Sequence, residues 1–353
     1  MDTFSVGVIG AGAWGTALAA ALARGGHRVE LWALEEDVVD SINTVHENKR
    51  YLPEYILDSS LTADSDIKKV ASGKDFLIMA SPSLYLAPTI SKFADIPDIK
   101  EGKTVIASLT KGFVPWKEDE MPHFVLETME KALPECYKNS TVYVAGPSHA
   151  EEVALGKLTG LIAASNNHRN AVKVRDLLRV KGIMAYASFD PVGVQVCAAV
   201  KNVIATVYGI LDAMAETSDI FGDNAESLLM AAGLNEIQII GFAMGATHAA
   251  TFTSISGVGD LDVTCKSKYG RNRRFGQDII KNGMLEKFKN LDDIIANVKE
   301  VGYLPEGAIA CKYVHVIAEK LNLRIPICNA LYRVLNKEIT PDAVLEEILA
   351  SRQ

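Results

Sequence analysis

A glycine motif near the start of the chain constrains the fold more than any other feature. Residues 10–15 have the spacing G-x-G-x-x-G, directly after a predicted strand over residues 5–10 and at the start of a predicted helix over residues 13–24. In this context the first glycine permits a tight turn, the second lets backbone approach a pyrophosphate, and the third lets helix and strand pack closely. The motif predicts a Rossmann-type dinucleotide site. The alternative is a glycine-rich helix start without a ligand.

The pattern of strands and helices changes halfway along the chain. Apolar runs at residues 27–33, 75–80, 104–109 and 141–145 alternate with helical patterns, including a charged helix over residues 35–48, and this alternation predicts a parallel sheet covered on both faces. After residue 190 the patterns are helical, at residues 190–215, 225–246 and 306–321 and from Pro341. We expect an α/β chain with an N-terminal Rossmann-type, mainly parallel sheet in residues 1–190 and a C-terminal all-helical domain in residues 191–353.

The composition limits the classes of function. The chain has 353 residues, 48% of them hydrophobic and 23% charged, which is a normal globular balance. Its net charge of -8 argues against a nucleic-acid partner but allows a local site for a phosphorylated small molecule. Five scattered cysteines and seven scattered histidines predict no metal site and a reduced, cytoplasmic setting. With no basic leader and no 18-residue apolar run, no membrane span is expected.

The choice of dinucleotide is predicted from the end of the second strand. Glu35 and Glu36 follow that strand, where an acid can accept hydrogen bonds from the adenosine ribose. An arginine in this place would attract the 2′-phosphate of NADP, and none occurs before Arg50. We therefore expect NAD as the preferred cofactor, with NADP also possible. Alternatively, the two glutamates only stabilise the N-terminus of the following helix.

Lys201 is the strongest candidate for acid–base chemistry. It lies beside Asn202 in residues 192–208, which are apolar around nearly the whole helical circumference and so indicate a buried helix. A lysine is rarely buried without a partner, and desolvation suits it to proton transfer. The alternative is a lysine that extends to water, although Lys201 shares an apolar stripe with Cys197 and Ile204.

Polar segments elsewhere could complete a site. Residues 257–261 carry one acid, Asp260, and Thr264 follows them. Residues 266–274 then hold five basic residues. This basic pattern is typical of phosphate recognition or, alternatively, of a solvated loop. Lys111 and residues 146–152 each follow a predicted strand, at the edge where open parallel sheets bind ligands. The second of these segments could also be an ordinary strand-to-helix loop.

Together these segments resemble the glycerol-3-phosphate dehydrogenase family. Eight stretches match in the family's order: GAGAWGTALA from Gly10, HENKRYLP from His46, LTKG from Leu109, GPSHAEEV from Gly146, AVKNVIA from Ala199, FGDNA from Phe221, SGVGDL from Ser256 and RNRRFG from Arg271. The resemblance implies a homodimeric NAD-dependent enzyme that interconverts dihydroxyacetone phosphate and sn-glycerol 3-phosphate and supplies glycerophospholipid synthesis. The rivals are a dehydrogenase of a 3-hydroxy acid and a non-catalytic NADH-sensing module.

The resemblance also implies a role for each matching residue. Catalysis would fall to Lys201 with Asp260 and Lys111. The substrate would contact Lys111, Gly146, Ser148, Lys201, Asn202, Asp260, Thr264, Gly270, Arg271 and Asn272. The cofactor would contact Gly10, Ala11, Gly12, Ala13, Trp14, Gly15, Leu34, Tyr85, Lys111, Ala150, Arg271, Leu304 and Glu306.

The chain departs from the family pattern at three places. Gly270 stands where many bacterial members carry serine, so one hydroxyl donor to the substrate phosphate is missing. Leu34 stands where bacterial members often carry arginine, which agrees with a preference for NAD. Residues 301–305, just before Glu306, also diverge from the usual pattern.

Overall fold

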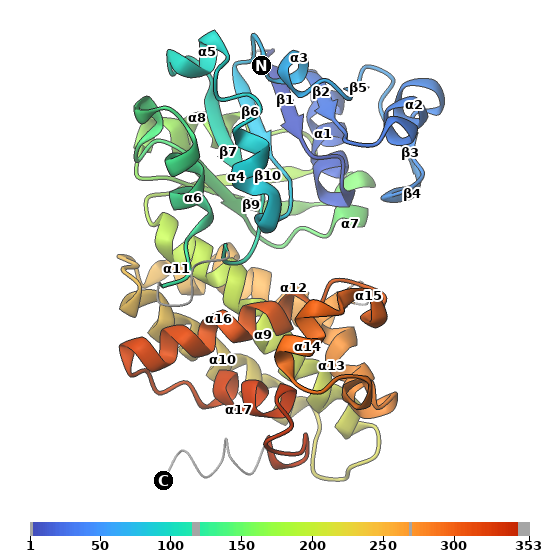
Figure 1. Ribbon diagram of the computed structural model, residues 1–353, viewed down its shortest axis with the longest axis vertical. Helices are drawn as coiled ribbons and strands as arrows, with labels where there is room; N and C mark the ends of the chain where they lie inside the picture. Colours follow the sequence, from blue (N-terminus) through green and yellow to red (C-terminus); the bar gives the residue numbers. More distant parts are fainter. Residues whose placement is uncertain (1–2, 115–120, 268–269, 345–353) are drawn as a thin grey trace. The chain divides into compact units, whose positions relative to one another are not determined.

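The structure is a computed structural model that describes residues 3–114, 121–267 and 270–344 (Figure 1). The chain divides into two compact units. Unit 1 comprises Met1–Pro115 and His123–Pro191, and unit 2 comprises Trp116–Pro122 and Val192–Gln353.

Unit 1 is built on an eight-stranded sheet in the order β10-β9-β8-β7-β6-β1-β2-β5. The strands are β1 (Ser5–Ile9), β2 (Arg28–Trp32), β5 (Thr62–Asp64), β6 (Phe76–Met79), β7 (Val105–Ser108), β8 (Val142–Ala145), β9 (Thr159–Ala164) and β10 (Ile183–Ser188). Neighbouring strands are parallel except β8 and β9, which are antiparallel. Because β1 lies between β2 and β6, its carboxyl end is the switch point at which open α/β sheets bind ligands.

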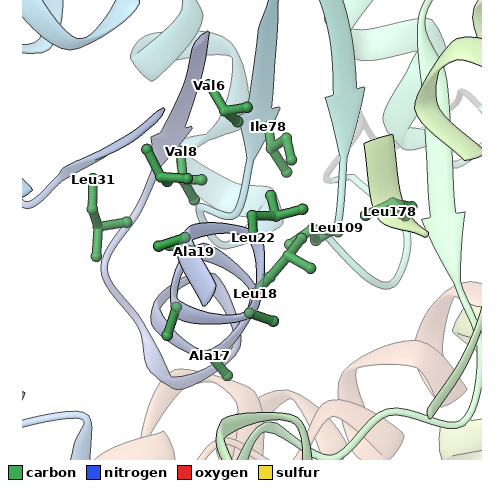
Figure 2. Close-up of a cluster of buried hydrophobic side chains, with 14 of the residues drawn as sticks. Val6, Val8, Ala17, Leu18, Ala19, Leu22, Leu31, Ile78, Leu109 and Leu178 are labelled. Carbon is green, nitrogen blue, oxygen red and sulfur yellow. The ribbon is translucent and has the colours of Figure 1, made fainter. Parts of the chain in front are cut away.

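Helices cover this sheet, and the first of them fixes the glycine motif. The helices are α1 (Ala13–Arg24), α2 (Glu36–Val45), α3 (Ile67–Ala71), α4 (Leu86–Ile90), α5 (Pro97–Lys100), α6 (Val125–Ala132), α7 (Ala150–Ala154) and α8 (His168–Leu178), with a short turn η1 (Ser83–Tyr85). Figure 2 shows Leu18 and Leu22 of α1 beside Val6, Val8 and Ile78 of the sheet, all of them buried. Burying each such side chain stabilises the fold by roughly 1.5–3 kcal/mol, so α1 is held firmly with its N-terminus at the end of β1.

The predicted elements of unit 1 need two corrections. The helix predicted over residues 35–48 ends at Val45, because His46 adopts a left-handed conformation with φ 54°, and β3 (Glu47–Asn48) then pairs with β4 (Leu52–Ile56) in an antiparallel hairpin. Strands β5, β9 and β10 of the main sheet had no counterpart among the predicted strands.

Unit 2 is helical throughout the part that is described. Its elements are α9 (Pro191–Ala215), α10 (Asp223–Ala243), α11 (Ala250–Thr253), the π-helical turn η3 (Ile255–Gly259), α12 (Asp260–Lys266), α13 (Arg271–Lys281), η4 (Met284–Lys287), α14 (Leu291–Ala296), α15 (Val298–Val301), α16 (Glu306–Leu321) and α17 (Pro326–Leu335). The helix predicted from Pro341 runs into residues 345–353, outside the described residues. Helix α9 is long and apolar enough to cross a membrane, yet its most apolar window is entirely buried, as in a core helix.

Two glycines bring neighbouring helices against α9. An ideal Cβ on Gly276 of α13 would lie 2.1 Å from the carbonyl oxygen of Thr206. An ideal Cβ on Gly307 of α16 would lie 2.2 Å from the hydroxyl of the same threonine. Both helices therefore cross α9 at Thr206, and Asn272 and Glu306, at their starts, both hydrogen-bond Asn202 of α9.

Candidate active site

The glycine motif forms a loop between β1 and α1, and each of its three positions requires glycine for a different reason. Gly10 has φ 123°, and its ideal Cβ would lie 2.9 Å from the carbonyl carbon of Ala80. The ideal Cβ of Gly15 would lie 2.1 Å from the carbonyl oxygen of Gly10. At Gly12, by contrast, no atom of the described residues lies within 4 Å of an ideal Cβ. Packing does not require glycine at this position, whereas a pyrophosphate lying against the backbone would, so the loop fits a dinucleotide.

A buried asparagine that the sequence analysis did not single out holds this loop. The amide nitrogen of Asn48 donates to the carbonyl oxygen of Ala11 and to the hydroxyl of Thr16, both at 2.8 Å. Its amide oxygen accepts from the backbone N–H of Tyr51 at 3.1 Å. The signal for Asn48 was its place in the HENKRYLP stretch, since a lone asparagine carries no pattern of its own.

The end of β2 carries the predicted acid. Glu35 precedes α2, but its side chain makes no capping hydrogen bond to that helix in the described structure. Instead its carboxylate accepts from the hydroxyl of Tyr51 at 2.7 Å, and this bond raises the pKa of Tyr51. Leu34 and Tyr85, which follow β2 and β6, are 68% and 58% exposed. Exposed apolar side chains on both sides of β1 are suited to cover an adenosine.

Other predicted residues of unit 1 lie at the same edge of the sheet. Lys111 lies in the loop that follows β7. In the same loop the hydroxyl of Thr110 donates to the carbonyl oxygen of Ser81 at 2.7 Å. Gly146 and Ser148 follow β8, and the serine hydroxyl donates to the glycine carbonyl at 2.8 Å. Ala150 begins α7. Because β1, β6, β7 and β8 are parallel, these loops and the glycine loop share one edge.

The centre of unit 2 is a buried ion pair. Lys201 and Asp260 are 4% and 1% exposed, and the lysine Nζ donates to Oδ1 of the aspartate. Nζ also donates to the hydroxyl of Thr264 at 3.0 Å, and that hydroxyl donates to the carbonyl oxygen of Asp260 at 2.6 Å. The alternative of a lysine extending to water is therefore wrong.

The second oxygen of Asp260 is buried and has no hydrogen-bond partner among the described residues. A buried acceptor without a donor is costly. A ligand hydroxyl donating to Oδ2 would remove that cost.

Two asparagines and a glutamate form a network next to this pair. The amide nitrogen of Asn272 donates to the amide oxygen of Asn202, and the backbone N–H of Gly307 donates to the amide oxygen of Asn272, both at 2.9 Å. Glu306 accepts from Asn202 at 3.4 Å and lies 3.5 Å from Nη2 of Arg271. The structure therefore brings Lys201, Asn202, Asp260, Thr264, Arg271, Asn272 and Glu306 together within unit 2. The carbonyl oxygen of Leu304 accepts a hydrogen bond from the backbone N–H of Glu306 at 3.1 Å.

The basic segment does not act as one cluster. Arg273 donates twice to Asp212, at 2.8 Å and 3.2 Å, and once to the carbonyl oxygen of Lys266 at 3.2 Å. Arg271 is the residue of this segment that joins the network around Glu306, while Lys268 lies outside the described residues. The sequence pattern therefore grouped residues with different partners.

The structure also explains Gly270. An ideal Cβ at this position would lie 2.9 Å from the carbonyl oxygen of Thr264. A serine here would have to push away the segment that carries Thr264. The close approach of the backbone therefore accounts for glycine at this position.

The arrangement of the cysteines and of possible metal ligands can be stated for the described residues. Within them, no disulfide joins any of the five cysteines. Within residues 3–114, 121–267 and 270–344, no three His, Cys, Asp or Glu side chains gather as metal ligands would.

Comparison with known proteins points to one family. The sequence model of the NAD-dependent glycerol-3-phosphate dehydrogenase N-terminus matches residues 5–171, and that of the C-terminus matches residues 190–346. A curated relative from Treponema denticola, called glycerol-3-phosphate dehydrogenase (NAD(P)+), is 56% identical over 349 residues, which cover 98% of each chain. A Bacillus subtilis relative with the same name is 35% identical over 345 residues, covering 98% of this chain and 94% of its own. A crystal structure of glycerol-3-phosphate dehydrogenase from Coxiella burnetii has a TM-score of 0.81 at 31% identity, covering 98% of this chain and 99% of its own.

Proposed function

Because the chain belongs to the NAD-dependent glycerol-3-phosphate dehydrogenase family, we propose that it transfers a hydride between NAD(H) and the pair dihydroxyacetone phosphate and sn-glycerol 3-phosphate. The observation that carries this proposal is the buried pair of Lys201 and Asp260. Burying two charges is expensive, and a module that only senses NADH has no use for them. The family match also disfavours a 3-hydroxy acid as substrate.

Unit 1 is proposed as the NAD-binding domain and unit 2 as the catalytic, substrate-binding domain. The open space at Gly12 and the position of Glu35 at the end of β2 support the cofactor role of unit 1. When bound, NADH supplies the hydride. Backbone N–H groups at the start of α1 would hold the pyrophosphate, since a helix N-terminus favours an anion.

In the proposed reaction Lys201 donates its proton to the C2 oxygen of dihydroxyacetone phosphate as that oxygen becomes an alkoxide. In the reverse direction the neutral lysine takes the proton back. Asp260 and Thr264 hold the amine in one position. A positioned proton donor typically contributes about 10²–10⁴-fold in rate, and positive charge near the oxyanion adds electrostatic stabilisation.

The substrate phosphate is proposed to bind Arg271 and Asn272. Arg271 is exposed and begins α13 next to Asn272, whose amide is fixed by Asn202 and Gly307. Binding energy from this non-reacting group can be used to orient the reacting carbon. The substrate roles of Lys111, Gly146, Ser148 and Gly270, and the cofactor roles of Tyr85, Ala150, Leu304 and Glu306, remain predictions from the family resemblance.

The proposed setting is a cytoplasmic homodimer that supplies glycerol 3-phosphate for glycerophospholipid synthesis. The free thiols agree with a reducing compartment. The dimer and the metabolic role rest on the family resemblance. Sedimentation of the purified protein tests the dimer, and a purely monomeric protein would contradict it.

The deciding experiment follows NADH oxidation with dihydroxyacetone phosphate for the wild type and for Lys201→Ala. We expect turnover by the wild type, poor turnover of dihydroxyacetone without phosphate, and a loss of about 10²–10⁴-fold in kcat for the variant. Calorimetric titration should show that the variant still binds NADH. Absence of turnover by the wild type, or near-normal turnover by the variant, would sink the proposal.

A further inference from the structure

The turn between β3 and β4 brings an arginine to the end of β2, where the sequence offers none. Nη1 of Arg50 lies 3.5 Å from Asp37 and its Nη2 lies 3.9 Å from Glu35. The guanidinium also lies over the ring of Tyr51, 5.4 Å from its centroid. These residues therefore form one cluster beside α2, in which Arg50 and Asp37 are exposed and Glu35 is half-buried. Arg50 and Glu35 are fifteen residues apart along the chain.

The position of this cluster relative to the glycine loop is fixed by Asn48. The side chain of Asn48 donates to the carbonyl oxygen of Ala11 in the loop and accepts from the backbone N–H of Tyr51 in the turn. The turn cannot move away without breaking the loop's own hydrogen bonds. Arg50 thus stands at a set distance from the residues proposed to bind the pyrophosphate.

The end of β2 is also where the adenosine ribose is expected. β1 and β2 run parallel with Ile9 opposite Trp32, so Glu35 follows β2 at the same edge as the glycine loop. In dinucleotide-binding sheets the acid at this position accepts from the ribose 2′-hydroxyl, and NADP places a phosphate there instead. That phosphate would lie next to Glu35 and within the reach of Arg50.

We propose that Arg50 is the residue that binds the 2′-phosphate of NADPH, and that Glu35 and Asp37 compete with this phosphate for the guanidinium. This inference rests on the proposed function, because it assumes that unit 1 binds a dinucleotide. The planar guanidinium can pair with a phosphate through two hydrogen bonds. With one arginine facing two carboxylates, the local charge favours NADH but leaves NADPH a binding partner. Arg50 thereby replaces the arginine that bacterial relatives often carry at the position of Leu34.

The test is calorimetric titration of the purified protein with NADPH and with NADH, which does not depend on turnover. Arg50→Ala should weaken NADPH binding by about tenfold or more, the usual effect of losing a hydrogen-bonded charge pair, and change NADH binding by less than about twofold. Arg50→Lys should restore part of the lost NADPH affinity, because lysine keeps the positive charge but lacks the planar guanidinium that can form two hydrogen bonds to the phosphate. Asp37→Asn should strengthen NADPH binding, because it removes a carboxylate that competes with the 2′-phosphate for the guanidinium of Arg50. It should not improve NADH binding, because Asp37 is not the acid expected to contact the ribose.

Lys49→Ala is the matched control. Lys49 is an exposed neighbour in the same turn, so its loss removes the same unit of charge without removing the guanidinium from Glu35 and Asp37. We expect it to leave the ratio of NADPH to NADH affinity unchanged. Four results would overturn the inference: no measurable NADPH binding by the wild type, unchanged NADPH binding by Arg50→Ala, an equal loss for both dinucleotides, or the same loss in Lys49→Ala. Because no substrate is present, these results stay separate from failure to reduce dihydroxyacetone phosphate.

Discussion

Gly12 and Gly15 belong to one motif but should respond differently to the same substitution. Alanine at Gly12 places a methyl group where the described residues leave open space, with φ −64°, so the free energy of unfolding should change by less than about 1 kcal/mol. The methyl group would obstruct the pyrophosphate, so NADH affinity should fall by about tenfold or more. Alanine at Gly15 meets the carbonyl oxygen of Gly10 and should destabilise the fold by about 1–3 kcal/mol.

Urea denaturation and calorimetric titration of both glycine variants check this contrast. Gly12→Ala should lose binding while keeping stability, and Gly15→Ala should lose stability. Unchanged NADH affinity in Gly12→Ala would show that the open space at this position is not used by the cofactor.

Single residues could be predicted from the sequence where the signal is local. Lys201 interrupts an apolar helix, and the helical repeat predicts that it is buried, as the structure confirms. Arg50 and Asn48 carry no such signal, because their partners Glu35 and Ala11 are brought close only by the turn after His46. Composition placed Arg273 in a basic segment considered for phosphate recognition, but its partner Asp212 lies sixty-one residues away on another helix.

At the scale of elements, Arg273 connects α9, α12 and α13. Its guanidinium bonds Asp212 of α9 and the last carbonyl oxygen of α12, and so fixes the start of α13, where Arg271 lies. Arg273→Ala should therefore reduce kcat/KM for dihydroxyacetone phosphate by roughly ten- to a hundredfold, mainly through KM, because small misplacements of binding groups are costly. NADH affinity should change little.

The control for Arg273 is an ion pair farther along the same helix. Lys281 of α13 lies 2.6 Å from Glu216, just after α9, and both side chains are substantially exposed. Exposed pairs contribute about 0–1 kcal/mol, so Lys281→Ala should leave KM unchanged. Steady-state kinetics of both variants decide the matter. Equal effects on KM would mean that Arg273 acts only through general stability.

Glu236 couples α10 to the start of α17 in a pH-dependent way. Its two carboxylate oxygens accept from the backbone N–H groups of Ile327 and Cys328 at 2.7 Å and 3.0 Å. Burial raises the pKa of Glu236 from 4.5 to about 6. The folded state therefore binds the proton more tightly, so the contribution of this group to stability is greatest below the unfolded pKa and is lost as the pH rises through about 6.

The full change is about 2 kcal/mol, of which roughly 1 kcal/mol falls between pH 5 and pH 7.5. The free energy of unfolding of the wild type minus that of Glu236→Gln, measured by urea denaturation, should therefore be more positive by roughly 1 kcal/mol near pH 5 than near pH 7.5. The exposed Glu319 provides the control, since Glu319→Gln should give the same difference at both. A pH-independent difference for Glu236→Gln would contradict the assigned effect of burial.

Element type could be predicted more reliably than element ends. The alternation of strands and helices, and the later helices, follow from repeating patterns several residues long. Strands β9 and β10 were missed because they read TGLIAA and IMAYAS, with glycine and alanine that favour strands weakly. The end of α2 depends on the backbone of His46, which no periodic pattern reveals.

At the scale of the whole molecule, the two units divide the proposed work. The glycine loop, Glu35 and Tyr85 belong to unit 1, and the Lys201 centre belongs to unit 2. Each unit has a hydrophobic core of its own, around α1 in unit 1 and around α9 in unit 2. Loss of proton transfer should therefore leave cofactor binding intact.

Thermal unfolding offers a direct test of this division. A ligand that binds only the folded protein stabilises it, by about 2.7 kcal/mol at a hundred times Kd, so saturating NADH should raise Tm by roughly 5–10 °C. Lys201→Ala should show the full rise, because its substitution lies in unit 2, whereas Gly12→Ala should show a smaller rise at the same NADH concentration. Differential scanning calorimetry measures all three proteins. A full rise in Gly12→Ala, or none in Lys201→Ala, would mean that the cofactor depends on the acid–base centre rather than on the glycine loop.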